Sequence, residues 1–180
     1  MLPGMTVVNP CDYNQTKLAT KAIYKHIGPV YLRFGRPKWP IFTKETDEFV
    51  IGKAQKLAEG TDVTILATGH MVWQSLQSVE ILEKEGISVE LLNIHTIKPL
   101  DKVAILNSAK KTGRVLVAEE HQKSGGLGES VASLLSQNYP TKMKLVGVND
   151  SFGESGKPLE LLEKYGLSVS DIIQKVRSFD

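Results

Sequence analysis

Two arginines lie three residues apart in the stretch GPVYLRFGRPKWP, residues 28–40. Arg33 and Arg36 follow a short apolar run, and Pro37 and Pro40 stiffen the chain beyond them. An arginine presents a planar, permanently charged fork that can hold a phosphate or a carboxylate through two parallel hydrogen bonds. One of the two side chains could therefore bind an anion, although solvation, or pairing with a neighbouring carboxylate, is the more ordinary explanation.

Other polar residues occur where apolar runs end. Glu119, Glu120 and His121 follow the run at 114–118, and His70 follows Thr68-Gly69 after the run at 62–67. Ligands gather at such strand ends in open parallel sheets, and a carboxylate beside an imidazole can do acid–base chemistry. Hydrogen bonding at an interface explains Glu120 and His121 equally well, and His70 could simply shape its turn. Adjacent strand residues point to opposite faces, so Glu119 and Glu120 cannot share a site while the strand continues.

The glycine-rich turn Gly125-Gly126-Leu127-Gly128 precedes a predicted helix. Such a turn can cradle a phosphate with backbone N–H groups. Its spacing matches neither the dinucleotide fingerprint nor the P-loop, and Glu129 already offers the helix a negative charge. The pattern favours a tight turn that lets the helix pack closely on the sheet.

The sequence lacks the signs of a self-contained active site. Its four histidines show no metal-ligand spacing, Cys11 is the single cysteine, and no Gly-x-Ser-x-Gly elbow occurs. We therefore expect no catalytic residue and no metal ligand in this chain.

The composition is that of an ordinary globular chain. The 180 residues are 41% hydrophobic and 23% charged, with a formal net charge of +2 from 22 basic and 20 acidic residues. This balance offers no electrostatic footprint for nucleic acid. No apolar stretch approaches the ~20 residues that span a bilayer, and no secretory signal pattern is present. We expect a cytoplasmic protein without a nucleic-acid or membrane partner.

Strand and helix patterns alternate along most of the chain. The alternation predicts an α/β fold with three αβα layers and a mostly parallel sheet. Runs such as VTILA and VLVA carry few polar residues, as expected for strands covered on both faces. The predicted strands are 6–9, 30–34, 62–67, 88–94, 114–118 and 143–148. The predicted helices are 12–26, 70–85, 101–112, one that opens at 125–128, 158–164 and 170–179.

We place a domain boundary near residue 45, where prolines and polar residues suggest a linker. Residues 1–45 supply one helix and two strands, which is too little to bury a core alone. They are either the tail of a larger domain or an added edge of the following sheet, and the pattern favours neither.

Six stretches, taken together, resemble the transketolase family, and in particular the C-terminal third of a thiamine-diphosphate transketolase. They occur in the family's order and cover nearly the whole chain. The sister enzymes, deoxyxylulose-phosphate synthase and the 2-oxoacid dehydrogenase beta subunits, share the architecture but match these stretches less well. The stretches are LPGMTVVNPCD (2–12), GPVYLRFGR (28–36), DVTILATGHMV (62–72), LLNIHTIKPLD (91–101), VAEEHQKSGGLGE (117–129) and SGKPLELLEKYGLS (155–168).

The resemblance implies that residues 1–45 are the C-terminal remnant of a pyrimidine-binding α/β domain and that residues 46–180 are the transketolase C-terminal domain. The family's Gly-Asp-Gly motif, its cofactor-activating glutamate and its stacking aromatic would lie upstream. The resemblance therefore implies a fragment or a separately made subunit that is inactive alone. Thiamine diphosphate and Mg²⁺ would belong to the complete enzyme, with neither bound by this chain alone.

The resemblance also implies site residues and partners. Arg36 matches a family arginine that binds the substrate's phosphate, and Arg33 is a weaker candidate for the same contact. His121, Glu120 and His70 would lie at an interface or at the edge of the site. The complete enzyme would move a two-carbon ketol unit between sugar phosphates in the pentose phosphate pathway, as a homodimer with an N-terminal transketolase section. Alternatives are a non-catalytic interaction or regulatory module, or the C-terminal part of one of the sister enzymes.

Overall fold

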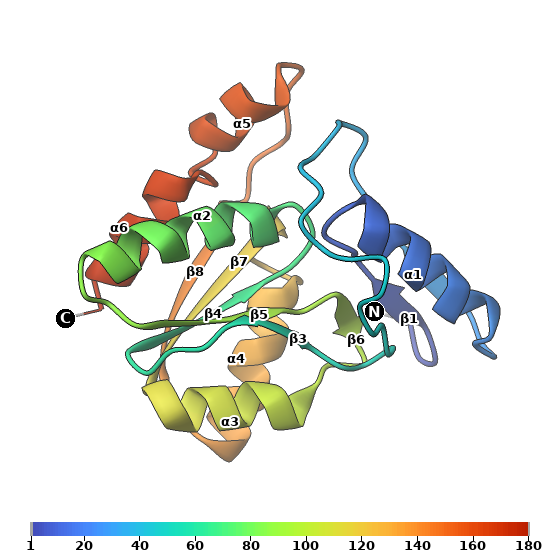
Figure 1. Ribbon diagram of the computed structural model, residues 1–180, viewed down its shortest axis with the longest axis horizontal. Coiled ribbons are helices and arrows are strands. Elements are labelled where there is room, and N and C mark those ends of the chain that lie inside the picture. The colour runs from blue at the N-terminus through green and yellow to red at the C-terminus, as the bar shows by residue number, and fades with distance from the viewer. Residues whose placement is uncertain (1, 180) are drawn as a thin grey trace.

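The fold is built on a five-stranded sheet in the order β3-β5-β4-β7-β8, as seen in a computed structural model that describes residues 2–179 (Figure 1). Its strands are β3 (Gln55–Ala58), β5 (Val89–Asn93), β4 (Val63–Ala67), β7 (Arg114–Gln122) and β8 (Lys142–Val148). Strands β4, β5, β7 and β8 are parallel, and only the edge strand β3 runs antiparallel to its neighbour.

Helices cover both faces of this sheet, which confirms the predicted three-layer α/β fold (Figure 1). Along β4, Val63, Ile65 and Ala67 pack into one core and Leu66 into the other, as strand alternation requires. All five residues of β4 are buried, which explains why its sequence is almost entirely apolar. The first core packs against α2 (Met71–Lys84), α5 (Pro158–Lys164) and α6 (Val169–Arg177), and the second against α3 (Lys102–Thr112) and α4 (Leu127–Asn138).

Local signals set the helix ends close to their predicted positions. The Asp101 side chain accepts a hydrogen bond from Ala104 N (3.1 Å) and so caps the start of α3. Gly113 ends that helix in the left-handed conformation (φ 67°), which glycine adopts without steric cost. Ser168 and Asp171 form a reciprocal capping box at the start of α6.

A separate three-stranded sheet contains the first part of the chain. Its order is β2-β1-β6, from β2 (Val30–Leu32), β1 (Thr6–Val8) and β6 (Thr96–Lys98). Strand β1 is parallel to β2 and antiparallel to β6, while α1 (Tyr13–Tyr24) connects β1 to β2. Strands β1 and β2 thus do not add an edge to the large sheet. The boundary near residue 45 stays a prediction, and β6 pairs across it.

Buried polar side chains join α1 to the large sheet. Asp12 caps α1 by accepting from Gln15 N (2.9 Å), and its other oxygen accepts from Thr43 N (2.7 Å). Asn93 at the end of β5 donates to Gln15 Oε1 (3.1 Å) and to Gln55 Oε1 (3.2 Å). The Asp12 bonds lie within the first segment, whereas the Asn93–Gln15 bond crosses to the large sheet. Because unpaired buried polar groups are costly, that bond helps to hold the first segment against the sheet.

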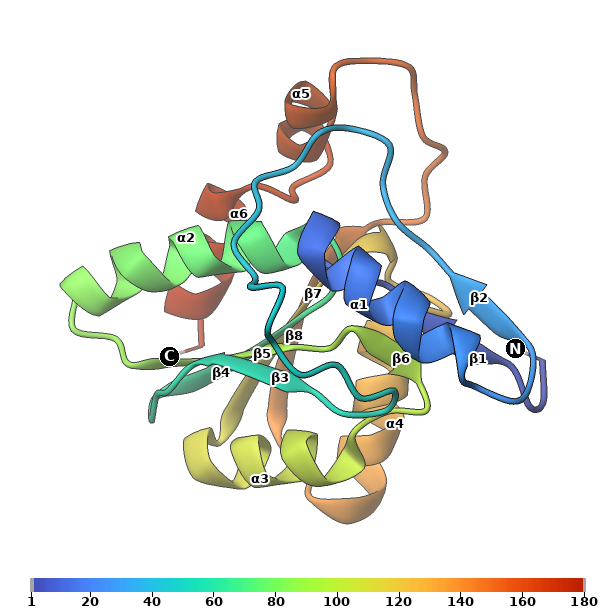
Figure 2. The same cartoon turned by 45° about the vertical axis from the view of Figure 1, so that its right-hand side comes forward.

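The chain between β2 and β3 forms a long irregular connection. It rises from β2 toward α5 and then returns past α1 to β3 (Figure 2). This connection carries Arg33 and Arg36 and brings them to the end of the sheet where the parallel strands finish. Within residues 2–179, no helix is long and apolar enough to cross a membrane.

Candidate functional site

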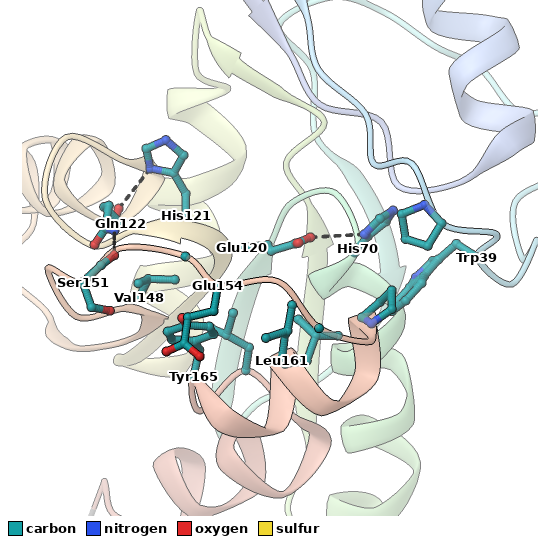
Figure 3. A pocket seen from close by; sticks show the side chains of 16 residues that line it. Trp39, His70, Glu120, His121, Gln122, Val148, Ser151, Glu154, Leu161 and Tyr165 are labelled. Carbon is teal, nitrogen blue, oxygen red and sulfur yellow. Dashed lines mark hydrogen bonds and ion pairs between the residues drawn. The ribbon is translucent and has the colours of Figure 1, made fainter.

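Three side chains, those of Trp39, His70 and Glu120, lie at the carboxyl ends of β4 and β7, and we call them the wall. His70, between β4 and α2, places its Nδ1 3.1 Å from Glu120 Oε2 on β7. Trp39, from the connection between β2 and β3, stacks on the His70 ring with centroids 4.4 Å apart (Figure 3). The structure thus brings together two of the residues predicted to lie at the edge of a site, and it adds an aromatic residue that the sequence did not single out.

The loop that carries Arg36 lies directly against this wall. A Cβ atom placed on Gly35 would lie 1.9 Å from His70 Cε1, so only glycine fits there without a shift of the ring or the loop. His70 therefore limits how closely the loop can approach, and Trp39 stacks on the same ring. Two pockets meet at the Trp39–His70 part of this wall, since Pro37, Trp39 and His70 line both of them, whereas Glu120 lines one.

The first of these, which we call the arginine pocket, has a volume of about 530 Å³. Tyr13, Arg36 and Lys38 line it together with the shared wall. Arg36 is exposed, and within residues 2–179 its guanidinium has no hydrogen-bond or ion-pair partner. The Asp12 carboxylate also lines this pocket, but both of its oxygens already accept backbone hydrogen bonds. The two cations and the phenol are therefore the groups that could meet an anion.

Arg33 has a different environment from Arg36. Its Nη2 donates a hydrogen bond of 2.6 Å to the backbone carbonyl of Glu120. This contact ties the end of β2 to the end of β7 and engages part of the guanidinium. The two arginines predicted together as anion ligands are therefore not equivalent, because only Arg36 keeps its whole fork available.

The second pocket, which we call the strand-end pocket, has a volume of about 430 Å³ and lies on the other side of the wall (Figure 3). Glu120, His121 and Gln122 of β7 line one side, and Leu161 and Tyr165 line another. His121 Nδ1 lies 3.2 Å from the carbonyl of Gln122, and the ring is exposed. In Figure 3 the His121 ring points away from the His70–Glu120 pair, so the three predicted edge residues do not form one cluster.

The glycine-rich turn before α4 binds a side chain of the protein itself. The buried Glu119 carboxylate accepts hydrogen bonds from Leu127 N (2.7 Å) and Gly128 N (2.8 Å). A Cβ on Gly126 would lie 2.2 Å from Glu119 Oε2, so the glycine permits this close approach. Burial raises the pKa of the Glu119 carboxyl, while the two backbone donors act in the opposite direction. The predicted tight turn is confirmed, and its N–H groups are occupied.

Glu119 and Glu120 point to opposite sides of β7, as expected from strand alternation. Strand β7 continues to Gln122, four residues beyond the run predicted at 114–118. Glu119 is buried against α4, whereas Glu120 is exposed and faces His70. Glu119 is thus a structural cap, and Glu120 alone belongs to the wall.

His95 and Cys11 are buried and lie outside the polar groups of the wall. Burial lowers the pKa of His95 to about 4, and its ring stacks on Phe49 with centroids 4.1 Å apart. Burial also raises the pKa of the Cys11 thiol strongly, so this cysteine is inert. Among residues 2–179, no three His, Cys, Asp or Glu side chains are grouped so that they could hold a metal ion.

Known proteins resemble this chain in both sequence and structure. Residues 52–172 match the family model of the transketolase C-terminal domain. The 6-deoxy-6-sulfo-D-fructose transketolase subunit SqwH of Clostridium sp. (strain MSTE9) is 47% identical over 96% of this chain and 54% of its own. A subunit of the apulose-4-phosphate transketolase of Phocaeicola vulgatus is 38% identical over 98% of this chain and 57% of its own.

A solved structure agrees with these sequence matches. It is described as a split gene transketolase, inactive beta4 tetramer, and it superposes with a TM-score of 0.95 at 43% identity. The superposition covers 98% of this chain and 58% of the other. The chain thus spans little more than half the length of these three relatives.

Proposed function

Since the chain belongs to the transketolase family, we propose that it forms the C-terminal part of a complete transketolase, which transfers a two-carbon ketol unit between sugar phosphates. The observation that supports this most directly is the match to a split transketolase over 98% of the chain at a TM-score of 0.95. Two relatives whose names call them transketolase subunits match with similar coverage. The partner in this proposal is an N-terminal transketolase section, and the complete enzyme is cytoplasmic and dimeric.

Thiamine diphosphate and Mg²⁺ belong to the complete enzyme in this proposal. The residues of this chain do not fit a metal site of their own, because within residues 2–179 no suitable group of three ligands exists. We therefore assign both ligands to the N-terminal section, and we expect the chain alone to be inactive. Its own contribution is an interface and a contact to the substrate.

We assign the substrate contact to Arg36 in the arginine pocket. The guanidinium is exposed and unpaired within the described chain, and Lys38 adds a second cation to the same pocket. A planar fork suits a phosphate, and it suits a sulfonate equally well. The substrates named for two relatives, a sulfo-sugar and apulose 4-phosphate, each carry such an anionic group. We therefore propose a sugar with a terminal phosphate or sulfonate as the substrate class.

Reconstitution tests the proposal. The 180-residue chain is mixed with an N-terminal transketolase section from the same genome, thiamine diphosphate, Mg²⁺, a ketose phosphate and an aldose phosphate. We expect ketol transfer only in the mixture, and a stable complex by size-exclusion chromatography. A stable complex without transfer would favour a non-catalytic interaction or regulatory module. Ketol transfer by the chain without a partner would contradict the proposal that the chain is inactive alone.

A further inference from the structure

The strand-end pocket has no part in the proposed phosphate contact, yet it has the properties of a ligand site. Its volume of about 430 Å³ falls in the range of small-molecule sites. It lies where β4, β7 and β8 end, the edge at which parallel sheets most often bind ligands. Its walls come from four separate parts of the chain, at 37–39, 70, 120–122 and 148–167.

Apart from two histidines, the ionisable side chains with a formal charge that line this pocket are acidic. Glu120 and Glu154 line it, whereas no lysine or arginine does. Glu120 Oε2 faces His70 at 3.1 Å and Glu154 Oε2 faces Lys164 Nζ at 2.6 Å. The second oxygen of each carboxylate has no partner within residues 2–179. Each carboxylate can therefore still accept a hydrogen bond from a bound cation through its second oxygen.

Aromatic and apolar groups form the rest of the lining. The Tyr165 hydroxyl donates to the carbonyl of Phe152 (3.0 Å), which fixes the ring, and Trp39 is held by its stack on His70. Figure 3 shows Tyr165 and Leu161 on one side of Glu120 and Trp39 on another. Aromatic faces attract cations, and the leucines offer a surface to an apolar body.

Two buried polar atoms of lining residues are unpaired. Within residues 2–179, neither Trp39 Nε1 nor Gln122 Oε1 has a hydrogen-bond partner. Buried polar atoms are paired in the great majority of cases, so two exceptions in one pocket call for an explanation. Gln122 Oε1 is an acceptor that a bound ammonium group could pair, whereas Trp39 Nε1 is a donor that such a group would leave unpaired.

We propose that the strand-end pocket binds a small organic cation, an ammonium group on an apolar body about the size of one aromatic ring. The free carboxylate oxygens of the lining residues hold the ammonium, and the body packs against Tyr165 and the leucines. This ligand differs in charge from any sugar phosphate, so the pocket is a second site and does not extend the arginine pocket. Trp39 and His70 separate the two sites.

The test uses three probes of one shape and different charge. Phenethylamine, phenethyl alcohol and 3-phenylpropionate are titrated at neutral pH into the 180-residue chain carrying Trp73→Phe. Trp39 is then the sole indole, since the chain has two tryptophans, and its fluorescence reports on the pocket. We expect the amine to bind about tenfold more tightly than the alcohol and the carboxylate to bind most weakly. Equal binding of amine and alcohol, tighter binding of the carboxylate, or no saturable amine binding would each overturn the proposal.

Matched variants locate the binding site. Glu154→Gln and Tyr165→Leu should each weaken amine binding about three- to tenfold, since they remove one acceptor charge and one aromatic face. Glu160→Gln is the control, because Glu160 is an exposed carboxylate on α5 that pairs with Lys157 outside the pocket. Circular dichroism verifies that each variant is folded. Equal losses in Glu154→Gln and Glu160→Gln would show that the amine responds to general charge, and the proposal would fail.

Discussion

His70 Nδ1 lies 3.1 Å from Glu120 Oε2 and thereby joins the start of α2 to the end of β7 across the edge of the sheet. The His70 ring of this pair also supports the loop that carries Arg36, because Gly35 packs directly against the ring. The position of the exposed arginine thus depends on contacts made by residues far away in the sequence. This dependence leads to the first two predictions.

Gly35→Ala should displace the loop, since the new Cβ would lie 1.9 Å from His70 Cε1. We expect a loss of about 1–3 kcal/mol in the free energy of unfolding, measured by urea denaturation of the chain. The loss should shrink in a His70→Ala background, where the clashing ring is gone. Gly153→Ala is the control, because a Cβ at Gly153 meets nothing within 4 Å. An undiminished loss in the double variant would contradict the proposed contact.

Arg36→Ala should impair the complete enzyme selectively. If Arg36 binds the terminal anion, KM for phosphorylated sugars should rise about ten- to hundredfold, as expected for the loss of charge-assisted hydrogen bonds. KM for the corresponding unphosphorylated sugars should change little. Arg177→Ala serves as the control, because Arg177 pairs with Glu85 on the surface and lies outside the arginine pocket. Equal effects of Arg36→Ala on both substrate classes would remove the assigned role.

Glu119→Gln should destabilise the turn before α4. A glutamine side chain offers one acceptor where Leu127 N and Gly128 N need two, and its amide would face one of these donors. We expect a loss of about 2 kcal/mol in the free energy of unfolding. Glu129→Gln should cost much less, since the exposed Glu129 accepts a single bond from Gly125 N that a glutamine can also accept. Equal stabilities of the two variants in urea would argue against Glu119 as the cap.

Stability should depend on pH through His95. Burial holds its folded pKa at about 4, below the ordinary value of 6.5, so the unfolded chain binds more protons between these pH values. The stabilisation by neutral His95 is therefore complete above pH 6.5 and is lost as the pH falls toward 4. The difference corresponds to ~3 kcal/mol of unfolding free energy.

Comparison of His95→Gln with the unsubstituted chain isolates this contribution. The variant should show a flatter dependence of unfolding free energy on pH between 4 and 6.5, whatever its absolute stability. His121→Gln is the control, because it removes an exposed histidine and leaves the contribution of His95 in place. Parallel curves for His95→Gln and the parent chain would show that His95 does not carry this pH dependence.

Local signals explain why most of the fold was predictable. Apolar runs mark the buried strands, and residues such as Asp101 and Gly113 mark helix ends through bonds made within a few positions. Strands β3 and β6 escaped prediction because they have four and three residues and mixed polarity. Their conformation depends on pairing with β5 and β1, and the sequence around them does not reveal those partners.

The site was predictable only in part for the same reason. His70 and Glu120 were found because ligands gather where parallel strands end, a rule that needs only the order of elements. Trp39 and Tyr165 belong to irregular segments, and tertiary packing alone brings them to the pocket. Two features of the sequence could have pointed to these residues. Trp39 lies in a proline-rich segment next to Pro40, and Tyr165 lies in the unusual stretch 155–168.

Strand β6 pairs with β1 although the two are separated by about half the chain, and this pairing limits how the protein can assemble. Any swing of the first 45 residues would break that ladder together with the hydrogen bond from Asn93 to Gln15. We therefore expect the first 45 residues to be folded and rigid before a partner subunit binds, so that association involves no coupled folding. The heat capacity change of association should then scale with the contact area alone.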